Sequence, residues 1–123
     1  MPNYHTGSER PAAVLDGIPH LYYMDPLEGR DRDGRVVRPE FIVDVTSMFE
    51  RKRAMLAEHA SQREWLRRHH GTDDYLDAME RWTRERGQLA GRTYGEGFRQ
   101  YRGHAYPQTH LLQELLSNHV VVT

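Results

Sequence analysis

The pattern of apolar and polar positions divides the chain into an irregular start, two short strands and a longer helical part. Residues 1–17 show no sustained period and carry turn-forming glycine and proline, so we expect a surface lead-in there. Residues 18–24 and 36–45 are short apolar runs, typical of strands, and the charged stretch DPLEGRDRDGR between them predicts a loop. We therefore expect residues 18–46 to form a strand pair joined by a charged loop.

From Thr46 onward, apolar positions recur with the 3.6-residue period of a helix. Ser47 and Glu50 fit a reciprocal capping box, which predicts where the helix begins. Residues 61–70 continue this helix or form a second one, which is expected to end at Gly71. Thr72 is expected to cap a further helix. The apolar stripe expected on the first helix consists of Met48, Phe49, Lys52, Met55, Leu56 and His59. The stripe expected on the helix after Thr72 consists of Tyr75, Leu76, Met79 and Trp82.

The segment after Gly91 reads RTYGEGFRQYRGHAYPQ, and we expect it to be irregular, with its aromatic residues packed against another surface. A short helix is expected at about 109–116, before the tail HVVVT. Residues 47–118 thus form the helical part. The chain is expected to be a single domain, 1–123, with two or three strands and three to four helices. By itself it would be α+β in class.

Composition narrows the function classes. The chain has 123 residues, 17 basic and 18 acidic, for a net charge of -1, which argues against a strongly electrostatic nucleic-acid binder. No apolar run approaches the ~18–20 residues of a membrane span, and the N-terminus lacks the pattern of a secretory signal. We therefore expect a cytoplasmic protein with neither a nucleic-acid nor a membrane partner.

The residue types that carry chemistry show no active site. The sequence has no cysteine, so a metal would need His, Asp or Glu ligands. The eight histidines include no H-x-x-H or H-x-x-x-H pair. The best local groupings are His69 and His70 with Asp73 and Asp74, and His110 with Glu114. They are better explained as helix ends and a surface pair. The residues alone therefore predict no catalytic and no metal-ligating side chain.

Several short motifs, in order, nevertheless resemble the closing third of the LmbE-like, or PIG-L, N-acetylglucosaminyl deacetylase family. They are Asp44-Val45-Thr46, Phe49-Glu50-Arg51-Lys52, His59-Ala60-Ser61-Gln62 and Tyr94-Gly95-Glu96-Gly97-Phe98-Arg99. Pro19-His20-Leu21-Tyr22-Tyr23 also resembles the P-x-L-Y-Y strand of that family. The resemblance covers about residues 18–116.

The resemblance implies an α/β, Rossmann-like fold and zinc-dependent removal of acetyl groups from amino sugars or related amides. The family's zinc-binding and general-base motifs, H-P-D-D-E and H-P-D-H, do not occur in this sequence. We therefore expect the C-terminal portion of such an enzyme, incomplete as a domain, inactive alone and without zinc of its own. The substrate-pocket candidates are Tyr94, Glu96 and Arg99. For Tyr94, donation to a developing oxyanion and simple packing are both open.

Two alternatives belong to other classes. In the first alternative, the chain is a non-catalytic interaction module that pairs with an N-terminal half or with a second copy of itself. In the second, it would be an independent helical metal or ligand binder that uses His69, His70 and Asp73.

Overall fold

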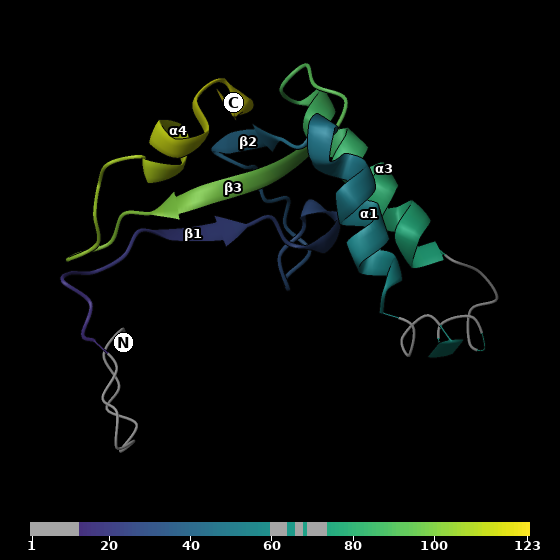
Figure 1. Cartoon of the computed structure of the whole chain (residues 1–123), viewed down its shortest axis with the longest axis horizontal. Coiled ribbons are helices and arrows are strands. Elements are labelled where there is room, and N and C mark those ends of the chain that lie inside the picture. The colour runs from purple at the N-terminus through teal and green to yellow at the C-terminus, as the bar shows by residue number, and fades with distance from the viewer. Residues whose placement is uncertain (1–12, 60–63, 66–67, 69–73) are drawn as a thin grey trace.

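Figure 1 shows the computed structural model of the chain, which describes residues 13–59, 64–65, 68 and 74–123. The described part is a mixed α and β structure whose strands form one antiparallel sheet. The strands are β1 (Leu21–Met24), β2 (Phe41–Asp44), β3 (Gly95–Tyr101) and β4 (Val120–Val122). The α-helices are α1 (Phe49–Ala57), α3 (Asp74–Gln88) and α4 (Leu111–Leu116). No helix in this part of the chain is long and apolar enough to cross a membrane.

The strand order is β1-β3-β2-β4, which corrects the expected two or three strands to four. The segment expected to be irregular contains the central strand β3, and the tail contains the edge strand β4. Phe98 of β3 pairs with Phe41, and Val121 of β4 pairs with Ile42. The strand pair expected over residues 18–46 is wrong, because β1 and β2 do not pair with each other. The strand β3 lies between them and pairs with both, and a sheet of this size is more stable than two strands alone.

A close helix approach explains one glycine of β3. A Cβ atom on Gly95 would lie 2.5 Å from Cγ2 of Ile42 and 3.0 Å from the Cα of Gly87 on α3, so a side chain there would collide with Ile42 and crowd the helix. Glycine at this point weakens the alternation by which a strand is recognised in a sequence, which is why β3 was expected to be irregular.

The helix α4 covers one part of the sheet with aromatic contacts. The ring of Phe41, only 1% exposed, lies 5.7 Å from that of Phe98 and 4.4 Å from that of His110, between centroids. The backbone N–H of Leu112 donates to the Tyr22 hydroxyl at 3.2 Å. Apolar burial and a satisfied helix N–H therefore hold α4 in place.

The helices α1 and α3 lie side by side at the end of the sheet where β2 ends and β3 begins (Figure 1). The expected capping box of Ser47 and Glu50 is wrong: α1 begins at Phe49, and no side chain caps it. The chain instead leaves β2 through a short 3₁₀ turn at Thr46–Met48. The carboxylate of Asp44 accepts the backbone N–H of Thr46 at the start of this turn. The side chain that bonds the backbone before α1 is therefore Asp44, three residues before the expected cap Ser47.

The expected apolar stripe of α1 is only partly buried. Phe49 is 2% exposed, whereas Met48 and Met55 are 56% and 65% exposed, and His59 lies beyond the last helical residue. The expected helix end at Gly71 and cap at Thr72 lie outside the described residues. The helix α1 thus keeps one apolar side chain in the core and leaves others uncovered.

Candidate functional site

Two of the motifs that carry the family resemblance meet where β2 passes into α1. The Oδ1 atom of Asp44 accepts hydrogen bonds from the backbone N–H and the hydroxyl of Thr46, at 3.0 and 2.6 Å. The Thr46 hydroxyl oxygen in turn accepts the backbone N–H of Tyr94 at 3.2 Å, and Val45 N–H donates to the Tyr94 carbonyl at 3.1 Å. The Asp-Val-Thr turn therefore fixes the residue that precedes β3.

A third motif, at the start of α1, contacts the same segment. The rings of Phe49 and Tyr94 stack at 3.7 Å between centroids, with an angle of 5° between their planes. The Nζ atom of Lys52 lies 2.7 Å from Oε1 of Glu96. Residues three apart share one face of a helix and residues two apart share one face of a strand. The two periods therefore place Phe49 and Lys52 directly against Tyr94 and Glu96.

The hydroxyl of Tyr94 is engaged by two charged side chains of α3. Arg84 donates to it at 2.9 Å, and it donates to Oε1 of Glu80 at 3.1 Å. Loss of hydration and the hydrogen bond to Glu80 raise the pKa of the Tyr94 hydroxyl, against the opposing charge of Arg84. The ring of Tyr94 thus packs on Phe49 while its hydroxyl is bonded to Arg84 and Glu80, and donation to an oxyanion stays a prediction.

Arg99 is not brought to the other two candidates. It lies on β3 an odd number of residues after Tyr94 and Glu96, and alternate residues of a strand point to opposite faces. Its charge acts instead on Asp25: burial raises the pKa of that carboxyl, while the guanidinium groups of Arg86 and Arg99 oppose the rise. The structure thus joins Tyr94 and Glu96 to α1 and does not bring Arg99 to them.

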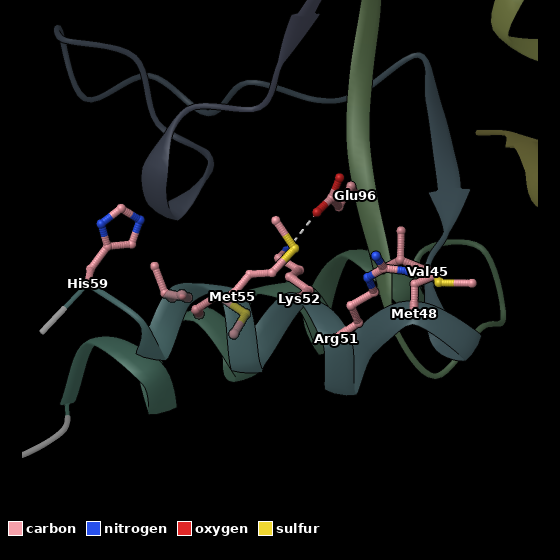
Figure 2. Close-up of a pocket in the computed structure, with 9 residues that line it drawn as sticks. Val45, Met48, Arg51, Lys52, Met55, His59 and Glu96 are labelled. Carbon is pink, nitrogen blue, oxygen red and sulfur yellow. Dashed lines mark ion pairs between the residues drawn. The ribbon is translucent and has the colours of Figure 1, made fainter.

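An open groove of about 490 Å³ lies beside the Lys52–Glu96 ion pair. Figure 2 shows Lys52 reaching from α1 toward Glu96, with Met55 and Met48 on its two sides along the helix. The apolar lining of the groove comes from Val45, Met48, Met55, Leu56 and Met79. Its polar lining comes from Arg51, Lys52, His59 and Glu96.

The helical spacing assigned most of these groove residues to apolar stripes, and only Glu96 was expected to line a substrate pocket, so the groove was missed. One signal was present, because Lys52 lies within the apolar stripe of α1. A lysine there needs a polar partner for its partly buried ammonium group, and the structure supplies Glu96 together with the Thr83 hydroxyl at 3.0 Å.

The described residues do not fit a zinc site. Among them, no three His, Asp or Glu side chains come together as metal ligands. His110 accepts the Gln113 backbone N–H at 3.2 Å through Nδ1 and packs on Phe41, so it serves as a helix cap rather than as a partner of Glu114. The grouping of His69, His70 and Asp73 lies outside the described residues. We therefore derive no metal chemistry for this part of the chain.

Comparison of the chain with known protein families, curated proteins and solved structures finds no match.

Proposed function

We propose that the chain is the C-terminal portion of a zinc-dependent N-deacetylase of the LmbE-like type, acting on N-acetylated amino sugars or related amides. In this proposal the zinc ligands and the general base belong to a separate Rossmann-like catalytic half. The chain described here contributes a wall next to the substrate and carries no catalytic residue. It is inactive alone.

The observation that carries this proposal is the contact between the motifs. Phe49 stacks on Tyr94 and Lys52 pairs with Glu96, although α1 and β3 are far apart in the sequence. The Asp44–Thr46 turn is bonded to the same Tyr94. Motifs that resemble one family and that also interlock in space support a common structural unit more strongly than scattered matches do.

The groove gives the proposed catalytic half a place to bind. Met48 and Met55 expose more than half of their surface, and methionine side chains adapt readily to a partner's shape. The groove also borders Glu96, one of the substrate-pocket candidates. A catalytic half seated on α1 would therefore bring its substrate close to the Lys52–Glu96 pair.

A second candidate function is a non-catalytic interaction module that pairs with a copy of itself. The same exposed methionines favour it, since uncovered apolar side chains on one helix face promote association. Sedimentation equilibrium over a wide range of protein concentration distinguishes this candidate, which requires a dimer that Met55→Glu dissociates.

The test of the first proposal combines the purified chain with a separately purified N-terminal half of an LmbE-like deacetylase. We expect no stoichiometric zinc binding by calorimetry and no N-acetylglucosamine deacetylation from the chain alone. We expect deacetylation to appear when the two halves are mixed. Turnover with tight zinc binding by the chain alone would contradict the proposal, as would an inactive mixture.

A matched pair of variants identifies the surface involved. Met55→Glu, in the groove, is expected to weaken reconstitution by roughly tenfold or more, because it buries an unpaired charge at the junction. Leu115→Glu is the control, since Leu115 is also exposed, at 68%, but belongs to α4. Equal effects of the two substitutions would place the docking surface elsewhere.

A further inference from the structure

Beside the uncovered methionines of α1 lie an arginine and a glutamate that no other described residue neutralises. Arg51 lies in the helix and Glu58 directly after its last residue, and both side chains are exposed. Neither forms an ion pair with another residue of the described part of the chain. The other two cations of the helix, Lys52 and Arg53, are each paired with an acid elsewhere in the chain. One cation and one anion are therefore left for a partner outside the chain.

The spacing of these residues places them in two neighbouring rows along α1. Met48 and Met55 are seven residues apart, and so are Arg51 and Glu58. Seven residues make about two helical turns, so the members of each pair lie on one side of the helix, about 10.5 Å apart. Arg51 is three residues from Met48 and four from Met55, so its row adjoins theirs. Figure 2 shows Arg51 beside Met48 at the groove.

The row of charges is complementary to itself. A two-fold axis that relates two antiparallel copies of α1 keeps this flank on the same side of both helices and reverses its order. Arg51 of one copy then faces Glu58 of the second copy, and the reciprocal pair forms at the same time. The midpoint between residues 51 and 58 lies next to Met55, so the methionines of the two copies meet at the axis. A parallel pair would instead put the charged flanks on opposite sides.

The backbone of α1 favours a helix as the occupant of this surface. The N–H and C=O groups within a helix bond one another, so α1 offers a partner mainly side chains. An extended segment laid on it would bury its own backbone groups without partners, whereas a second helix satisfies its own. Methionine side chains adapt to the shape of such a partner. Opposite charges on the partner offset the cost of covering Arg51 and Glu58.

We propose that the chain forms an antiparallel homodimer through α1, in which Met55 packs on Met55 of the second copy between two Arg51–Glu58 ion pairs. This inference rests on the second candidate function, the pairing of the chain with itself, and gives that interaction its geometry. The interface comprises little more than two helical turns, so we expect weak and reversible association. A second copy on Met55 covers part of the groove, so one protomer does not hold a copy and a catalytic half at the same time.

Sedimentation equilibrium of the full chain, at up to about 1 mM protein, measures the dimer. Arg51→Glu and Glu58→Arg each put like charges together at both ion pairs. Each is therefore expected to raise the dissociation constant of the dimer at least about tenfold. The double variant Arg51→Glu/Glu58→Arg exchanges the two charges and restores both pairs. Its dissociation constant is expected to return to within about threefold of the wild-type value.

Two control variants make the same changes of net charge away from α1. Arg35→Glu and Asp33→Arg lie in the exposed loop between β1 and β2, and each is expected to leave the dissociation constant unchanged. The substituted positions on α1 are also exposed, so the variants are expected to fold. Recovery in the double variant could not come from a misfolded protein.

The outcomes separate this arrangement from self-pairing in general. A dimer that Met55→Glu dissociates but that neither charge reversal weakens would overturn the proposed ion pairs and leave the interaction module standing. Single reversals that weaken the dimer without recovery in the double variant would also overturn the proposal. A chain that stays monomeric up to about 1 mM would overturn both the proposal and the second candidate function.

Discussion

The sheet is covered in two different ways, by aromatic side chains under α4 and by ion pairs at the end next to α1 and α3. Under α4, Phe41 contacts the rings of Tyr22, Phe98 and His110. At the other end, Lys52 pairs with Glu96, and a carboxylate that is 3% exposed pairs with Arg86.

This difference separates stability from binding. Burial of aromatic rings reliably stabilises a fold, whereas a buried ion pair is weak evidence for stability because both charges lose their hydration. Uncovered methionines also flank the Lys52–Glu96 pair. We infer that the α4 side maintains the fold and that the α1/α3 end is where a ligand or partner binds.

The largest expected effect comes from the aromatic side. Phe41→Ala removes the ring that joins three others and is expected to lower the free energy of unfolding by about 3–5 kcal/mol. Urea denaturation followed by circular dichroism measures it. Leu115→Ala, at a residue of α4 that is 68% exposed, is expected to change stability by less than about 0.5 kcal/mol. Similar losses in the two variants would contradict a core centred on Phe41.

The next effect tests the charged end. Gly97→Ala forces a methyl group against the Asp25 carboxylate and to 3.0 Å from Cβ of Pro39, with an expected cost of about 1–3 kcal/mol. The cost is expected to shrink when Asp25→Ala is introduced together with it, in a double-mutant cycle of unfolding free energies. Gly17→Ala is the control, because a Cβ there meets no atom within 4 Å. An unchanged cost in the Asp25→Ala background would show that the carboxylate is not what Gly97 accommodates.

The regular elements with a clear period could be predicted from the sequence. The strands expected within residues 18–24 and 36–45 are confirmed as β1 and β2. The helices α1, α3 and α4 lie where helical spacing indicated them. The strands β3 and β4 were missed for tertiary reasons. Glycine at 95 and 97 meets a helix and a carboxylate, and β4 has only three residues, whose pairing with β2 decides their conformation.

The candidate site was predictable only in part. Once β3 is known to be a strand, the two-residue alternation of side chains places Tyr94 on the same face as Glu96 and Arg99 on the other. No local pattern indicated Asp25, which stands at the start of a charged loop and looks solvated. Its burial follows from Arg86, distant in sequence, and from Gly97, whose missing side chain leaves the space. A contact of this kind has no sequence period.

A smaller change in stability tests whether the motif of Phe49 and the motif of Tyr94 stabilise each other. A double-mutant cycle of Phe49→Ala and Tyr94→Ala is expected to give a coupling of about 0.5–1.5 kcal/mol in unfolding free energy, because the stacked rings are lost together. Tyr94→Phe keeps the ring and removes only the hydroxyl contacts with Arg84 and Glu80. Coupling between Phe49→Ala and Tyr94→Phe should therefore be close to zero. A cycle that closes without coupling would mean that the stack does not join α1 to β3.

The last comparison concerns the sign of a pH dependence at two aspartates. Burial raises the pKa of Asp25 despite Arg86, whereas the hydrogen bonds from Thr46 and the charge of Arg92 outweigh burial and lower the pKa of Asp44. As pH falls toward the unfolded value of about 3.9, the folded state takes up a proton at Asp25 before the unfolded chain does, which stabilises it. At Asp44 the unfolded chain takes up the proton first, so stability is lost as pH falls through and below that value. Measured by urea denaturation between neutral and acidic pH, the stability of the wild type relative to Asp25→Asn should rise on acidification, and relative to Asp44→Asn it should fall. The same sign for both variants would contradict the contrast between a carboxylate that burial destabilises and one that its hydrogen bonds stabilise.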